Sequence, residues 1–144
     1  MRSILLGAAL AVLVLPAHAS AQQRTLEDVE QDYDASVRCA GIYGAAATGK
    51  EMQTSPNNPD VATYRGRERE FADYTKRFGP QLRLSDDAIE DAVSDVRGSV
   101  FRSAREALFA QDEPTFLSEL EGIYGLIPDC EAERIRIYRS MGSD

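Results

Sequence analysis

The sequence predicts a small all-α domain, and three observations support this fold class. Four long segments carry apolar residues at intervals of three or four positions, the spacing of one face of an α-helix. No segment shows the alternating pattern of a half-buried strand. Cys39 lies in the first segment, and Cys130 lies 91 positions later in the last. We therefore expect an antiparallel four-helix bundle with a kinked or broken fourth helix, closed by one disulfide between these cysteines.

The first 21 residues have the composition of a secretory signal peptide. Arg2 precedes an apolar run over residues 4–15, and a tract of small residues follows. Cleavage after Ala19 or after Ala21 satisfies the small-x-small rule, and the polar residues beyond the second site favour it. We therefore expect residues 22–144 to form a single helical domain that is exported and is not inserted in a membrane.

The first predicted helix begins at Thr25 and continues to about residue 48. Thr25 and Asp28 have the spacing of a capping box, with Asp in place of the usual Glu. The apolar face of this helix is predicted to consist of Leu26, Val29, Tyr33, Val37, Ala40, Gly44 and Ala47. The many small residues at positions 37–47 indicate a helix that other helices approach closely, with a ligand groove as the alternative. Cys39 lies at the edge of this face.

A loop is predicted over residues 49–59, because its Pro, Asn and Ser content cannot sustain a helix. The second helix then begins at residue 59 or 60 and ends before Gly79 and Pro80. Its apolar face is predicted to consist of Val61, Tyr64, Phe71, Thr75 and Phe78.

Glu68 falls on the apolar face of this second helix. A carboxylate in that position either pairs with a cation or has a raised pKa, so Glu68 is the candidate buried carboxylate for acid–base chemistry. The structural alternative is that Glu68 pairs with Arg65 or Arg69, or that it reaches solvent.

The third helix is predicted to begin at the cap Ser85 and to continue past residue 104. Its apolar face consists of Ile89, Ala92, Val93, Val96, Val100, Ala104 and Ala107. On the opposite face, Asp87, Asp91 and Asp95 form a row of carboxylates at four-residue spacing. The row lacks the Gly turn and terminal Glu of a calcium loop, so we interpret it as a solvated acidic surface rather than a cation site.

The fourth helix is predicted to begin at Asp112, which can cap a first turn that contains Pro114. Its apolar side consists of Phe116, Leu117, Leu120, Ile123, Tyr124 and Ile127. Gly125 and Pro128 then predict a break, after which a last helix carries Cys130.

The residue types of the mature chain exclude several classes of function. His18, the only histidine, lies in the predicted signal peptide. With both cysteines oxidised, no imidazole or thiolate remains for a catalytic triad, a zinc site or a haem ligand. We therefore expect no cofactor and no bound metal, and we favour a non-enzymatic role over an enzymatic one. Loss of Arg2 changes the formal charge from −8 to −9, which disfavours nucleic acids and anionic membranes as partners.

Two classes of function remain. The first is an exported non-enzymatic helical protein, in the periplasm or outside the cell, that binds or protects another protein of the bacterial envelope. The second is a carboxylate-dependent enzyme, or a carrier of a small ligand or cation, that uses Glu68 or the acidic helix faces. A buried and unpaired Glu68 beside a pocket would favour the second class, whereas a filled core and an exposed apolar patch would favour the first.

Overall fold

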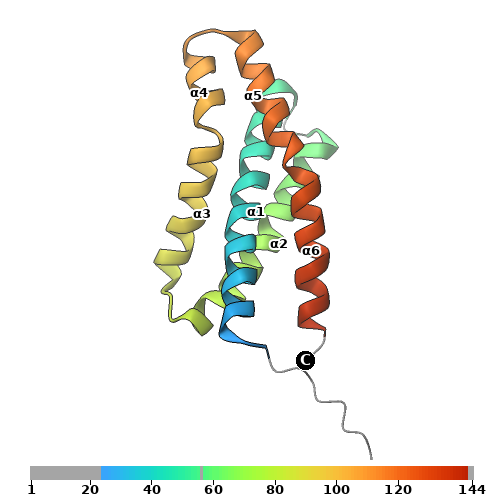
Figure 1. Ribbon diagram of the computed structural model, residues 1–144. Coiled ribbons are helices and arrows are strands. Elements are labelled where there is room, and N and C mark those ends of the chain that lie inside the picture. Colours follow the sequence, from blue (N-terminus) through green and yellow to red (C-terminus); the bar gives the residue numbers. More distant parts are fainter. Residues whose placement is uncertain (1–23, 56, 143–144) are drawn as a thin grey trace, which may run out of the picture.

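The computed structural model describes residues 24–55 and 57–142, and it confirms the all-α fold class (Figure 1). These residues form helices and turns, without a strand among them. The predicted signal peptide and its cleavage sites lie outside the described residues. Within them, no helix is both long and apolar enough to cross a membrane. In chain order the elements are α1 (Leu26–Gln53), α2 (Pro59–Phe78), the 3₁₀-helix η1 (Gly79–Leu82), α3 (Asp86–Val100), α4 (Arg102–Phe109), α5 (Glu113–Gly125) and α6 (Ile127–Met141).

Helix α1 lies at the centre of the molecule, and α2, α3, α5 and α6 all pack against it (Figure 1). Every residue in the range 39–47 is buried, so this part of α1 is covered on all sides. Most of these residues are Ala or Gly, whose small size lets neighbouring helices come close. At Gly41 an added Cβ would lie 2.5 Å from Val96 Cγ1 and 2.9 Å from the backbone nitrogen of Arg97. The predicted close approach of other helices is therefore confirmed.

Helix α1 is longer than the sequence pattern predicts. We expected a loop from residue 49, but the helix continues to Gln53, so that prediction is wrong. The added residues, 50–53, are Lys, Glu, Met and Gln, all of which are good helix formers. Arg65 of α2 also holds this last turn, because its Nη2 lies 3.0 Å from Oε2 of Glu51.

The third predicted helix is broken at Phe101 into α3 and α4, where a single helix was expected. In a continuous helix Phe101 would lie about 100° around the axis from Val100 and off the apolar face. The break instead buries Phe101 in one core with Ala104 and Ala107. The burial of a large aromatic ring explains why the helix is interrupted here.

The predicted break in the fourth helix is confirmed. Helix α5 ends at Gly125, Leu126 forms the turn, and α6 begins at Ile127. Pro128 lies in the first turn of α6, where its missing N–H group costs no helical hydrogen bond.

The buried side chains form two cores that follow one another along α1. The first surrounds the two cysteines and includes Tyr43, Phe71, Phe78, Ile89 and Ile137. The second includes Ala45, Ala46, Phe101, Ala104, Ala107, Phe116, Leu120 and Ile123. This second core forms where the hairpin of α4 and α5 packs against the C-terminal part of α1. At Gly49 of α1 an added Cβ would lie 2.4 Å from Leu120 Cδ2, so the hairpin also requires a small residue.

The predicted disulfide between Cys39 and Cys130 is present, and it joins the middle of α1 to the first turn of α6. Both cysteines are buried, and their Cα atoms are 5.4 Å apart. Helix α6 packs mainly against α1 and only lightly against α5. The bond therefore holds a helix that has few other packing partners.

Substitution of Gly41 by Ala should destabilise the fold, because the new methyl group would overlap Val96 and the backbone of Arg97. We expect urea unfolding to show a loss of about 1 to 3 kcal/mol, the usual cost of overpacking. Gly98→Ala is the control, since nothing lies within 4 Å of an added Cβ at that position. The control should raise stability by about 0.5 to 1 kcal/mol through helix propensity. Equal effects of the two substitutions would contradict close packing at Gly41.

Replacement of Cys39 and Cys130 together by Ala should lower the melting temperature by many degrees. In the chain-entropy model a bond that spans 91 positions contributes roughly 4 to 5 kcal/mol, and strain reduces the realised value. Helix α6 should lose protection first, so limited proteolysis should cut the double variant beyond residue 128 while the oxidised wild type resists. A double variant that melts within a degree or two of wild type, or a bond that exchanges readily with glutathione, would overturn the structural role.

Candidate functional site

Figure 1 shows the end of the molecule where α4 turns into α5, near the end of α1. A groove lies there between the side chains of these elements. Its volume is about 690 Å³. We call it the tip groove, and its lining consists of Met52, Gln53, Leu108, Gln111, Asp112, Glu113, Phe116 and Leu117. These residues come from α1, from α4 and its following turn, and from α5, so only the folded chain brings them together.

The turn between α4 and α5 sets the shape of the tip groove. Gln111 adopts a left-handed backbone conformation, with φ of 56°, at a position that Gly usually occupies after a helix. The N–H groups of Gln111 and Asp112 donate to the carbonyl oxygens of Leu108 and Ala107 and so close the end of α4. The side chain of Asp112 then accepts from the backbone N–H of Thr115 and caps α5, as the sequence predicted.

Large apolar side chains at the tip groove remain in contact with solvent. Phe116 is buried beneath them, whereas Met52 is 50% exposed and Leu108 and Leu117 are each 40% exposed. The sequence pattern placed Leu117 on the core face of the fourth helix and Met52 in a loop, and both assignments are wrong. Exposed apolar side chains that cluster around a groove mark sites of interaction with other molecules.

The charges of the tip groove are acidic. Asp112 and Glu113 are the charged side chains of its lining. They belong to a stretch, residues 106–133, that contains eight acidic side chains and no basic one. Hydrogen bonds from the side chain and the backbone of Thr115 lower the pKa of Asp112, so this carboxylate is ionised at neutral pH.

Glu68, the candidate carboxylate, lies in α2 with 14% of its side chain exposed. Nη1 of Arg65 lies 2.8 Å from its Oε2, and Nη2 of Arg97 lies 3.0 Å from its Oε1. Arg69, the other partner considered, donates from Nε to the backbone oxygen of Arg65 at 3.2 Å. Arg97 belongs to α3, so spacing along α2 gave no sign of it. Glu68 therefore ties α2 to α3, and it does not line the tip groove.

The row of Asp87, Asp91 and Asp95 is exposed along α3. Four-residue spacing on a rigid helix arranges the carboxylates in a line, whereas calcium requires oxygens that converge on one point. Among the residues that the structure describes, no group of three or more His, Cys, Asp or Glu side chains is arranged to hold a metal ion.

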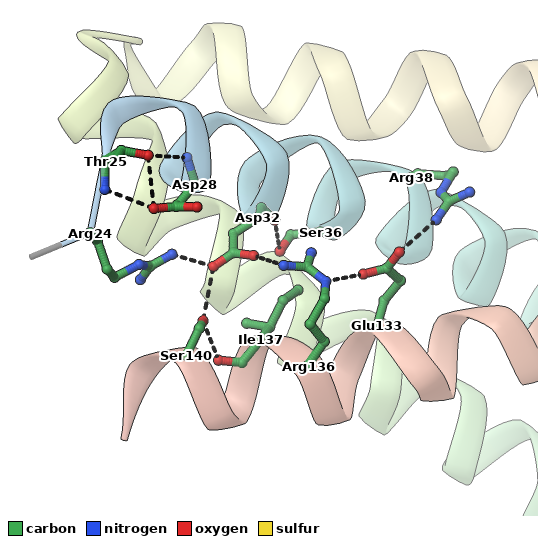
Figure 2. A network of polar contacts seen from close by, with 10 residues as sticks. All are labelled: Arg24, Thr25, Asp28, Asp32, Ser36, Arg38, Glu133, Arg136, Ile137 and Ser140. Atoms are coloured by element: carbon green, nitrogen blue, oxygen red, sulfur yellow. Dashed lines mark hydrogen bonds and ion pairs between the residues drawn. The ribbon is translucent and has the colours of Figure 1, made fainter. Parts of the chain in front are cut away.

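Asp32 is a buried carboxylate that the apolar pattern of the first helix did not reveal, and only 1% of it is exposed. Figure 2 shows that it accepts hydrogen bonds from Arg24, which precedes α1, and from Arg136 and Ser140 of α6. The Ser140 hydroxyl lies 3.0 Å from Oδ2. Ser36, one turn later in α1, donates to the backbone oxygen of Asp32. This network anchors the start of α1 to the end of α6.

The spacing between Cys39 and the polar residues around it could have revealed this network from the sequence. Ser36 lies three residues before Cys39, Asp32 lies four residues before Ser36, and Tyr43 lies four residues after Cys39. These residues share one face of α1, and the disulfide shows that this face is turned toward α6. A second helical face, next to the apolar one, was therefore present in the sequence.

Tyr43 connects the same interface to α2 through a second network. Its hydroxyl donates to Glu131 of α6, which also accepts from Nε of Arg67 at 2.8 Å and from Nε of Arg134 at 2.9 Å. Burial, and then the bond to Glu131, raises the pKa of Tyr43 far above the ordinary value. Burial alone would raise the pKa of Glu131, but the bonds from Tyr43 and Arg134 and the nearby Arg67 charge lower it.

Comparison with protein-family models, with curated proteins and with solved structures yields no match for this chain. Two kinds of feature are therefore available for a functional interpretation. The polar networks around Asp32, Tyr43 and Glu68 have groups that bind one another and join helices. The tip groove has apolar side chains that face solvent.

Substitution of Asp32 by Asn should destabilise the fold, because it removes the charge that binds Arg24 and Arg136. We expect a loss of roughly 1 to 3 kcal/mol in urea unfolding, since both arginines keep partial access to water. Asp34→Asn is the matched control, because Asp34 is exposed on the same helix. The control should stay within about 0.5 kcal/mol of wild type. If the two variants unfold alike, the Asp32 network does not anchor α1.

Stability should fall as the pH rises from about 10, the ordinary tyrosine pKa, toward about 12. The pKa of Tyr74 and the pKa of Tyr124 are each raised to about 12, mainly by burial. Because the unfolded chain releases these protons first, stability present below pH 10 is lost as the pH approaches the folded values. A variant with Tyr74→Phe and Tyr124→Phe should show a smaller loss. Urea unfolding at pH 9 to 12 measures the free energy of unfolding of the wild type and of this variant. The same dependence on pH in the two proteins would contradict the prediction.

Proposed function

We propose that this chain is an exported, non-enzymatic helical protein of the bacterial envelope that binds another protein through its tip groove. The observation that carries the proposal is the set of exposed apolar side chains, Met52, Leu108 and Leu117, around a groove of about 690 Å³. The scaffold is an antiparallel four-helix bundle in this proposal, with α3 and α4 as its broken third helix and α5 and α6 as its broken fourth.

Export is supported by the composition of residues 1–21 and by the disulfide. A buried bond between Cys39 and Cys130 is typical of proteins that fold in an oxidising compartment. A mature chain that begins after Ala21, or after Ala19, would reach the periplasm or the medium. Arginines far outnumber lysines in this chain, which is typical of bacteria with GC-rich genomes.

A non-enzymatic role is supported by what the side chains already bind. Glu68 is held between Arg65 and Arg97, and it lies away from the tip groove. Asp32 and Glu131 are each bound by several donors from α6 or α2. A carboxylate-dependent enzyme or a cation carrier, the alternative function, would instead need an unpaired carboxylate beside a cavity.

The rigidity of the scaffold also suits a binding protein. The disulfide and the Asp32 and Tyr43 networks fix α6 against α1, and Gly49 seats the α4–α5 hairpin on α1. The tip groove therefore has a fixed shape, and a partner would bind without paying for large rearrangements.

Site-specific photo-cross-linking in the source organism tests the proposal. A photo-reactive residue at position 117 should form an adduct with a partner protein, and Met52→Gln should weaken that adduct because it removes apolar contact. Position 135 on α6, where Ile135 is 43% exposed, is the matched control. Intact mass of the recovered chain should correspond to a start at Gln22. Equal adducts at both positions, or none at position 117, would contradict binding at the tip groove.

A further inference from the structure

We infer that the tip groove binds a cationic amphipathic helix, that is, a segment of another protein whose apolar side chains are flanked by Lys or Arg. This inference rests on the proposed function and adds the chemistry of the partner. The sign of the charge around the groove and the apolar character of its lining together select this class of ligand.

The charged side chains in the lining of the groove are all acidic. Asp112 and Glu113 lie in it, and no basic side chain does. Lys50, in the last turns of α1, has its Nζ 3.4 Å from Oδ2 of Asp60 and lies over the ring of Tyr124. The charge of this lysine is therefore already paired. Such a surface attracts Lys and Arg and repels carboxylates, which sets association rate and specificity.

The walls of the groove include large apolar side chains. Met52, Leu108 and Leu117 lie around the buried ring of Phe116, and the volume of about 690 Å³ can hold several side chains. An amphipathic helix inserts side chains at positions i, i+3 or i+4, and i+7 into a groove of this kind. Met52 has a flexible and polarisable side chain that adapts to different apolar partners.

The same charges disfavour other occupants. Residues 22–144 have a formal charge of −9, and two copies that met at their tip grooves would bring Asp112 and Glu113 of both copies together. Anionic lipids and fatty acids would be repelled by the same two carboxylates. A different protein with a basic segment is the occupant that satisfies both the apolar lining and its charge.

Titration with a fluorescent synthetic helix of Leu and Lys tests the inference on the oxidised mature protein. A second peptide keeps every Leu and replaces every Lys with Glu. The Lys peptide should bind at least about tenfold more tightly than the Glu peptide at low salt, and the difference should shrink as salt screens the charges. Equal binding of the two peptides would overturn the inference.

Matched variants distinguish binding at the tip groove from general attraction of the Lys peptide to an acidic protein. Asp112→Asn with Glu113→Gln should weaken binding of the Lys peptide by about tenfold, because two favourable charge contacts are lost while Asn still caps α5. The control, Asp87→Asn with Asp91→Asn, makes the same change in net charge on the exposed face of α3 and should change binding less than about twofold. Equal weakening by both pairs would show nonspecific attraction and overturn the inference.

A second set of variants tests the apolar contacts. Met52→Gln with Leu117→Gln should lower the affinity for the Lys peptide by about tenfold. Ile135→Gln with Tyr138→Gln, exposed side chains of α6, should not. Circular dichroism checks that each variant is folded. Glu113→Gln alone leaves the Asp112 cap of α5 untouched, and it should still weaken binding of the Lys peptide, by less than the double charge variant does.

The remaining outcomes distinguish the inference from the proposed function. A groove-dependent cross-link to a native partner, without preference for the Lys peptide, would overturn the inference and leave the function in place. Sedimentation that showed a dimer, lost on Met52→Gln with Leu117→Gln, would make a second copy the occupant and overturn the inference. Failure of both the cross-link and the peptide titration would overturn the inference together with the function.

Discussion

Burial of the middle of α1 on every side is the constraint on which the rest of the structure depends. Residues 39–47 of this helix are all covered, and Gly41 and Gly49 allow α3 and α5 to approach the α1 backbone. The small side chains that make this possible bury little apolar area for each turn of helix. Additional ties are therefore needed to hold the outer helices, and α6, which packs mainly against α1, depends on them most.

Those ties are covalent and polar, and the polar ones involve the carboxylates of Asp32, Glu68 and Glu131. The disulfide lies between two networks on the same face of α1, one around Asp32 and the other around Tyr43. Glu68 performs a similar task between α2 and α3. Carboxylates and a buried tyrosine can suggest a catalytic centre, but here their oxygens bind arginines and hydroxyl groups that join one helix to another. Their roles are therefore explained by cohesion of the fold.

The α4–α5 hairpin differs from the rest of the molecule in this respect. It is bounded by the turns at Phe101 and Leu126, and its contact with α1 is made mainly by the apolar second core, to which the Tyr124 hydroxyl adds a hydrogen bond to Oε1 of Gln53 at 3.0 Å. At its tip, Gln111 accepts a left-handed backbone conformation so that α4 can turn sharply into α5. The turn leaves Leu108 and Leu117 facing solvent beside Met52, and residues 106–133, from the second half of α4 onward, carry only acidic charge. Apolar exposure with one sign of charge is the property that points to a partner.

The sequence by itself determined the features that depend on a few neighbouring residues. The caps at Thr25, Ser85 and Asp112 and the break before Pro128 follow from local hydrogen bonding and backbone geometry, and a chain with two cysteines left one choice of intramolecular disulfide. Tertiary structure decided the rest. The Arg97 partner of Glu68, the Asp32 network and the tip groove join residues from helices far apart in the chain, and the break at Phe101 depends on a core built largely by α1 and α5. Such contacts depend on how the helices are rotated and placed against one another, which the helical period of one segment does not specify.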